Sequence, residues 1–280
     1  MVDVVVRPLG PIASTSDTPS KVRVARGGSG ATLAVILAGA GHEVTFVGAC
    51  GDDLAADLVE RSLEGAGVTP RLQRHDVSTG VVVALVSEDG ERAMLTDRGG
   101  NGLLEREFVV DEFESAEHVH VSGYVILDDA SRTVGATALA EARARGLSTS
   151  VDVCSVAPLR ALGPQRFLDA TIDAQVIFAN EEEALALSGT DELDAAMDFL
   201  ADRYGEVFVT RGRDGAWSHV EGQRHVVSAR EAVVRDTIGA GDASTGAYLG
   251  ARLDGASVVT AMQAAMDAGA RAVSEFGAPG

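Results

Sequence analysis

The sequence has almost no lysine, few aromatic residues and only two cysteines. Of its 23 basic residues only Lys21 is a lysine, and aromatic residues make up 4% of the 280 positions. Cys50 and Cys154 lie far apart in the chain, and neither has a cysteine or histidine at metal-ligand spacing. Neither a zinc site nor a disulfide framework is therefore indicated. We expect both cysteines to be reduced thiols in the core.

Long apolar runs and clusters of basic residues are also missing. No uninterrupted apolar run approaches the roughly 20 residues that cross a bilayer, and the N-terminus lacks the regions of a signal peptide. The formal net charge is −19, which disfavours contact with the phosphates of nucleic acid. We therefore expect a soluble, cytoplasmic protein that binds neither membranes nor nucleic acid.

Apolar runs of strand length alternate with helix-length segments over most of the chain. Examples are EVTFVG before DDLAADLVERSLEGAG, HVHVSG before DDASRTVGATALAEARARG, and AQVIFA before EEEALALSG. Gly41, Gly67 and Gly146 follow the last apolar position of three helical segments, where helices commonly end. This alternation is typical of a mostly parallel sheet flanked by helices. The predicted fold class is α/β, in a single domain spanning residues 1–280 because no linker or repeat divides the chain.

Two regions interrupt the alternation, residues 2–26 and residues 71–98. The second contains two strand patterns joined by an EDGE turn at residues 88–91. Strands inserted in this way cannot bury both faces by themselves, so they must cover a ligand or another copy of the chain. We predict a small β lid inserted in the domain and a two-fold homodimer formed through its strands.

The stretch DTIGAGDASTG combines small residues with two carboxylates at the point where a helical pattern begins. Gly239, Ala240 and Gly241 lie at the expected helix N-terminus, whose free N–H groups and positive dipole bind anions. Asp242 lies in the first turn, where a carboxylate can accept the proton of an attacking hydroxyl. This pairing suits phosphoryl transfer from a nucleotide to an alcohol. A glycine-rich turn with Asp242 as an ordinary helix cap fits the same residues.

The motif DTIGAGD resembles the C-terminal signature of the ribokinase-like carbohydrate kinases, the PfkB family. GGSGATLAVILAGAG, at residues 27–41, is similar to the N-terminal glycine motif of the family, and FVGACGDDLAADLVERSLEGAGV follows in the expected order. The resemblance covers nearly the whole chain. It implies a ribokinase-like three-layer fold and an ATP-dependent sugar kinase, in which Asp242 is the general base and Gly239 to Gly241 form the anion hole.

The resemblance also implies a donor site with magnesium. Asn180 and Glu183 in ANEEEALALSG match the residues that organise Mg²⁺, through water at Glu183, and the nucleotide phosphates. The same two residues also suit a helix cap. Other nucleotide-contacting positions implied by the resemblance are Thr210, Gly212, Gly215 and Thr237. Asp236, with the terminal SEFGAPG, resembles the K⁺-responsive loop of many members.

On the acceptor side, the positions that match the family are Asp3, Gly27, Gly28, Arg98 and Gly123. Thr32 stands where the family has an asparagine against the sugar hydroxyls. A threonine offers one hydroxyl where an amide offers a carbonyl and an NH₂ group, so the identity of the sugar stays open. His118 and His120 alternate on an apolar strand and are interpreted as structural.

Two alternative functions stay open at this point. A nucleoside kinase of the same fold would need an aromatic lid residue to stack on a base, and the lid segments contain none. A non-catalytic sugar-binding or regulatory member could keep the fold without turnover.

The start of the chain is short for the family, in which a central strand precedes the acceptor-binding aspartate. Only Met1 and Val2 precede Asp3. We expect either that Met1 is an internal residue of a longer natural chain, or that another segment, such as residues 2–7, takes the place of that strand.

Overall fold

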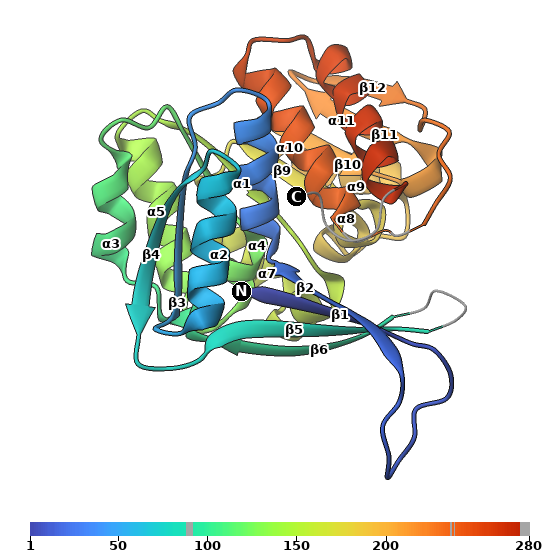
Figure 1. Ribbon diagram of the computed structural model, residues 1–280. Helices are drawn as coiled ribbons and strands as arrows, with labels where there is room; N and C mark the ends of the chain where they lie inside the picture. Colours follow the sequence, from blue (N-terminus) through green and yellow to red (C-terminus); the bar gives the residue numbers. More distant parts are fainter. Residues whose placement is uncertain (88–91, 236, 238, 275–280) are drawn as a thin grey trace.

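The computed structural model describes residues 1–87, 92–235, 237 and 239–274 (Figure 1). Its centre is a six-stranded sheet. In spatial order the strands are β12 (Gln223–Val227), β11 (Ala216–Val220), β10 (Glu206–Thr210), β9 (Val176–Asn180), β8 (Ser148–Asp152) and β7 (His118–Val121). Strands β7 to β10 are parallel, and β11 and β12 form an antiparallel hairpin at one edge. The predicted α/β class is confirmed.

Helices cover both faces of this sheet. The helices on one face are α1 (Ser29–Gly39), α10 (Ala240–Leu253) and α11 (Val258–Val273). Leu249 and Met262 of these helices pack on Phe178 and Phe208 of the sheet. Each such buried side chain contributes roughly 1.5–3 kcal/mol through removal of apolar surface from water.

The opposite face is covered by a second group of helices. These are α3 (Arg106–Val110), α4 (Gly123–Leu127), α5 (Arg132–Ala144), α6 (Val156–Leu162), α7 (Pro164–Ala170), α8 (Glu181–Ser188) and α9 (Leu193–Ala201). Leu139 of α5, Met197 of α9 and Ile177 of β9 are fully buried in the core on this side. In the described part of the chain, no helix is long and apolar enough to span a bilayer.

A four-stranded sheet forms the lid at one end of the molecule (Figure 1). Its order is β2 (Ser20–Arg26), β1 (Val2–Pro8), β5 (Thr79–Val86) and β6 (Arg92–Gly99). Asp53, which caps α2 (Leu54–Gly65), accepts hydrogen bonds from the N–H and hydroxyl of Thr79 at 2.8 and 2.6 Å. This aspartate therefore links lid strand β5 to helix α2. The EDGE turn predicted between the lid strands lies outside the described residues.

Two strands expected elsewhere form a separate sheet. β3 (Thr45–Gly51) pairs in parallel with β4 (Thr69–His75). Residues 71–75, which the sequence grouped with the lid, therefore belong to β4, and the second lid segment starts at Thr79. Within the described ranges, β7 has a strand neighbour on one side only, β8.

The first strand lies in the lid. β1 pairs antiparallel with β2 and parallel with β5, and Asp3 lies opposite Ala25. The alternative in which residues 2–7 enter the central sheet is therefore wrong.

Candidate active site

The N-terminus of α10 has features that suit an anion. Gly239 has φ 73°, a left-handed conformation that glycine adopts without steric cost, and no side chain of the described residues caps the helix. The first N–H groups of a helix lack partners within it, and the dipole of this 14-residue helix is positive here. Ala240, Gly241 and Asp242 form the first turn. The predicted helix start at Gly239 to Gly241 is confirmed.

Three helix starts and the end of one strand meet at the Asp242 carboxylate. Ser29, the first residue of α1, donates its hydroxyl to Asp242 Oδ1 at 2.7 Å. The same hydroxyl lies 3.0 Å from Oδ2 of Asp152, the last residue of β8. Asp152 Oδ1 accepts a hydrogen bond of 2.6 Å from the N–H of Gly123, which opens α4. The carboxyl ends of parallel strands are the usual position of ligand sites in α/β sheets.

The environment of Asp242 favours its protonated form. Burial, followed by the negative charge of Asp152, raises the pKa of Asp242 to about 6. The hydrogen bond from Ser29 and the positive charge of Arg26 act in the opposite direction. A carboxyl group with a pKa close to neutrality can both accept and release a proton at working pH.

The expected acceptor residues lie together beside this carboxylate. A Cβ on Gly27 would lie 1.9 Å from Asp3 Oδ1, so the contact between the glycine loop and the lid requires glycine. Thr32 is buried at 1% exposure and accepts a hydrogen bond from Arg26 Nη1 at 3.3 Å. Gly28 has φ 96° and is the N-cap residue of α1.

Sequence reasoning missed Arg26. It is 6% exposed, and the negative charges of Asp3 and Asp242 interact with its guanidinium. Burial raises the pKa of Asp3, against the charges of the Met1 amino group and Arg26. The signal available in the sequence was a basic residue directly before a glycine pair, which by itself is weak.

Gly123 contacts Asp152, and Arg98 contacts residues of α4, the helix that Gly123 begins, and the position after it. Gly123 is required sterically because a Cβ there would lie 2.3 Å from the carbonyl oxygen of Asp152. Arg98 forms an ion pair with Asp128 at 2.6 Å and donates from Nη2 to the carbonyl oxygen of Tyr124 at 3.1 Å. Its guanidinium also lies 5.7 Å from the centre of the Tyr124 ring. The role of Arg98 toward a phosphoryl group stays a prediction.

Asn180 and Glu183 form a capping box at the start of α8. Asn180 Oδ1 accepts from the N–H of Glu183 at 2.9 Å, and Glu183 Oε2 accepts from the N–H of Asn180 at 2.8 Å. Glu183 is 5% exposed, and burial raises its pKa to about 7. In the described part of the chain, no group of three acidic, histidine or cysteine residues is arranged for a metal. The oxygen donors of this pair still fit Mg²⁺, which takes few protein ligands and keeps several waters.

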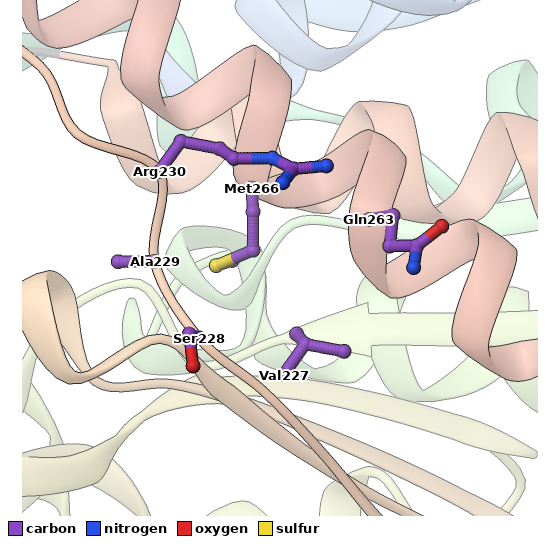
Figure 2. Close-up of a pocket in the computed structure, with 6 residues that line it drawn as sticks. All are labelled: Val227, Ser228, Ala229, Arg230, Gln263 and Met266. Carbon is purple, nitrogen blue, oxygen red and sulfur yellow. The ribbon is translucent and has the colours of Figure 1, made fainter.

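A pocket of about 200 Å³ lies between α11 and the segment after β12. Figure 2 shows the side chains that line it: Val227, Ser228, Ala229, Arg230, Gln263 and Met266. Gly269, three residues after Met266, faces α10, since a Cβ there would lie 3.8 Å from the carbonyl oxygen of Ala240. Met266 is therefore about one turn of α11, or roughly 5 Å along that helix, from the point where α11 meets the start of α10. No sequence motif indicated this pocket.

The segment after β10 supports one wall of this pocket. Gly215 has φ 89°, and a Cβ there would lie 2.0 Å from the carbonyl oxygen of Val227. Thr210 ends β10, Gly212 follows with φ 54°, and the carbonyl of Thr237 accepts from the N–H of Ala240 at 3.4 Å. Asp236 and residues 275–280, predicted to form the potassium loop, lie outside the described residues.

The prediction that both cysteines lie in the core is wrong for one of them. Cys50 is buried, as expected, but Cys154 is partly exposed beside the site. Its Sγ lies 3.3 Å from Ser122 Oγ, and its backbone has a left-handed φ of 72°. The reason is its position directly after Asp152 and Val153, where β8 has ended and the chain turns toward α6.

His118 and His120 are packed within the sheet, as the sequence suggested. Both rings hydrogen-bond Ser150 Oγ, at 2.7 and 2.8 Å, and His118 also contacts Ser148 Oγ at 2.8 Å. Burial lowers the pKa of both imidazoles, that of His118 to about 3. The two rings are therefore neutral at physiological pH.

A carboxylate held beside an uncapped helix start, within an α/β fold, is the arrangement of an enzyme that transfers a phosphoryl group to a hydroxyl. The chain belongs to the pfkB family of carbohydrate kinases, because the family profile described as pfkB family carbohydrate kinase matches residues 1–279. It is therefore a phosphotransferase with an alcohol group of a sugar as acceptor.

Similar proteins support this assignment. An ATP-dependent ribose-1-phosphate kinase of Halopiger xanaduensis is 33% identical over 260 residues, which cover 91% of this chain and 83% of that protein. The structure of adenosine kinase from Sinorhizobium meliloti superposes with a TM-score of 0.87 at 22% identity, covering 100% of this chain and 93% of that one. A ribokinase II structure from E. coli in complex with ATP and Mg²⁺ gives a TM-score of 0.85 at 23% identity, covering 99% and 91%. The two structural similarities confirm the ribokinase-like fold.

Proposed function

We propose that this sugar kinase uses ATP as phosphoryl donor and Asp242 as general base. The observation that carries the proposal is the partly buried Asp242 carboxylate in the first turn of an uncapped helix, with Ser29 fixing one of its oxygens at 2.7 Å. A base adjacent to an anion site is useful only where the bound anion is attacked by a hydroxyl.

The reaction then follows from the positions of these groups. The acceptor O–H bond breaks as its proton moves to Asp242, and the acceptor oxygen forms a bond to the γ-phosphorus of ATP. The bond from that phosphorus to the bridging oxygen breaks, and ADP leaves. N–H groups at Gly239 to Gly241 stabilise the negative charge of the transferring group.

For the donor, we assign the adenine to the pocket between α11 and residues 227–230. The pocket has apolar walls in Val227 and Met266 and polar groups in Ser228 and Gln263, the usual mixture for a small-molecule site. Asn180 and Glu183 would hold Mg²⁺, which supplies charge neutralisation on the phosphates when bound. Activation by K⁺ stays a prediction.

For the acceptor, we propose a pentose that already carries a phosphate group. The relative of 33% identity is described as a ribose-1-phosphate kinase. The buried guanidinium of Arg26 places a positive charge beside Asp3 and Thr32, among the expected acceptor residues. Asp3 provides a carboxylate for sugar hydroxyls.

The two alternative functions receive less support. The described lid strands contain no aromatic side chain that could stack on the base of a nucleoside acceptor. A non-catalytic protein would have no requirement for a positioned base, whereas Asp242 is held by a short hydrogen bond.

We also propose a homodimer formed through the lid. Val22, Val24 and Leu95 are 60%, 53% and 58% exposed. They share one face of the lid sheet, because Val24 lies opposite Val4, Val22 opposite Val6, and Leu95 opposite Val83. A second copy of the same face would remove this apolar surface from water.

The proposed function is tested by measuring ADP release from ATP with ribose 1-phosphate, ribose, fructose and adenosine as acceptors. We expect ribose 1-phosphate to give the highest kcat/KM. Asp242→Asn should lower kcat by at least about a hundredfold, the scale of losing a positioned base, while the KM for ATP stays within a few-fold.

A higher kcat/KM with an unphosphorylated sugar would contradict the phosphorylated acceptor. Turnover by Asp242→Asn at a rate comparable with that of the wild type would contradict the base.

A further inference from the structure

Asp152 is a buried carboxylate to which the mechanism above gives no role. It is 7% exposed, at the end of β8. Its Oδ1 accepts from the backbone N–H of Gly123 at 2.6 Å, and its Oδ2 lies 3.0 Å from the hydroxyl oxygen of Ser29. Burial of an ionised carboxylate is costly unless charges or hydrogen bonds compensate it. Its hydrogen-bond donors include a backbone amide, the thiol of Cys154 and the hydroxyl that also holds Asp242.

Ser29 therefore lies between two carboxylates. Its oxygen is 2.7 Å from Asp242 Oδ1 and 3.0 Å from Asp152 Oδ2. A serine hydroxyl has a single proton to donate, so it satisfies one carboxylate at a time. Two carboxylates that accept from the same hydroxyl repel each other when both are ionised. This repulsion favours protonation of one of them.

We propose that Asp152 is a positioning residue that acts on the catalytic base through Ser29. The inference rests on the proposed function, in which Asp242 accepts the proton of the sugar hydroxyl. Asp152 and Ser29 hold the Asp242 carboxylate in one orientation, and they set in opposite directions how strongly it binds a proton. The negative charge of Asp152 strengthens proton binding, and the hydroxyl of Ser29 weakens it.

Several other groups surround the two carboxylates. The charged or titratable ones are Asp3 of β1, Arg26 of β2, His120 of β7, Tyr124 of α4, Cys154 after β8 and Glu183 of α8. His120 Nε2 is 3.8 Å from Asp152 Oδ1, but burial lowers the pKa of His120, so this ring carries no charge that would neutralise Asp152. After burial, the negative charge of Asp152 is the largest influence that raises the pKa of Asp242 to about 6.

The two variants should displace the pH profile of kcat/KM in opposite directions. Asp242 accepts a proton only when ionised, so kcat/KM should rise with pH through its pKa. Asp152→Asn removes the negative charge but keeps an oxygen for the N–H of Gly123. The rising, acidic limb of the pH profile of kcat/KM should therefore move to lower pH by about one unit. Ser29→Ala removes the hydrogen bond to ionised Asp242, and the limb should move to higher pH.

The experiment is the pH dependence of kcat/KM for the preferred acceptor at saturating ATP, for both variants and the wild type. Ser29→Thr keeps a hydroxyl and should restore the wild-type limb. Asp202→Asn, the same chemical change at an exposed position after α9, is the matched control and should leave the profile unchanged. Circular dichroism and Tm measurements establish that each variant is folded.

Displacement of the limb in opposite directions by Asp152→Asn and Ser29→Ala supports the inference. Unchanged limbs in both, or displacement in the same direction, would overturn it, even where Asp242→Asn is inactive and the base assignment stands. If Asp152→Asn does not fold, Asp152→Ser, which also removes the charge and keeps an oxygen, takes its place. Turnover by Asp242→Asn with Asp152 intact would instead remove the base, and the inference with it.

Discussion

At the scale of single residues, two carboxylates at helix starts, Asp242 and Glu183, have different hydrogen-bond partners. Asp242 and Glu183 both lie in the first turn of a helix, and burial raises the pKa of each. Glu183 is held by the backbone of Asn180 in a capping box, whereas Asp242 has no such partner and contacts a side chain of another helix, Ser29. The first arrangement stabilises a helix in its own right, and the second leaves the carboxylate available for chemistry.

The proposed metal role of Glu183 can be separated from its capping role by Glu183→Gln. The amide oxygen still accepts from the N–H of Asn180, so we expect Tm to change by only a few degrees. The Mg²⁺ concentration for half-maximal rate should rise at least about tenfold, the usual scale for loss of a residue that supports a metal site, while the KM of the sugar is unchanged. Glu182→Gln, at an exposed neighbouring position, is the control. An unaltered magnesium titration would leave Glu183 as a helix cap only.

At the scale of secondary-structure elements, close packing of α10 against α11 joins two parts of the donor site. Gly269 lets the helices approach, because a Cβ there would lie 2.6 Å from Ser244 Oγ. Met266 lies about one turn of α11 from Gly269, and Gln263 lies about one turn further along the same helix. Gly215 in turn holds Val227 against the turn after β10. A nucleotide that bound its phosphates at α10 could therefore extend its base into the pocket shown in Figure 2.

The pocket assignment predicts a response of Met266 to nucleotide. In protein labelled with ¹³C at methionine methyl groups, ADP should shift the Met266 resonance, because an adenine ring would lie against its thioether. Met197, fully buried in α9, is the internal control and should not move. The acceptor alone should leave Met266 unchanged. A Met266 resonance that does not move at saturating ADP would place the base elsewhere.

At the scale of the whole molecule, the lid has two faces with different surroundings. Asp3 faces the glycine loop at Gly27. Val22, Val24 and Leu95 lie on the opposite face of the lid sheet and are more than half exposed. Adjacent residues of a strand point to opposite sides of its sheet, so one short strand, β1, serves both the acceptor site and the apolar surface. Dimer formation and acceptor binding would therefore depend on the same four strands.

The dimer is tested by light scattering coupled to size exclusion at micromolar concentration. The wild type should have twice the mass of the 28.8 kDa chain, and Leu95→Glu should be monomeric because a charge cannot be buried in an apolar interface without large cost. Ile172→Glu, at a 66% exposed position outside the lid, should stay dimeric. A monomeric wild type, or a dimer that survives Leu95→Glu, would contradict an interface through the lid.

Local patterns in the sequence determined the fold class and the elements. The apolar alternation predicted β3, β7, β8, β9 and β10 and the helices between them, because side-chain periodicity follows directly from backbone geometry. The small residues before Asp242 predicted a helix start with free N–H groups, because an apolar helical pattern begins directly after them. The family signature added expectations for Asp3, Gly27, Thr32 and Asn180.

Tertiary structure alone decided which distant residues meet. Ser29, Asp152 and Asp242 are far apart in the chain, and nothing local marks them as hydrogen-bonded partners until the end of β8 and the starts of α1 and α10 converge. Pairing with β3 took residues 71–75 out of the lid, and the end of β8 carried Cys154 out of the core. Hydrogen bonding between strands and the packing of helices act between remote segments, so the sequence could name Asp242 as a candidate base but not Ser29, which contacts it, or Asp152, which contacts Ser29.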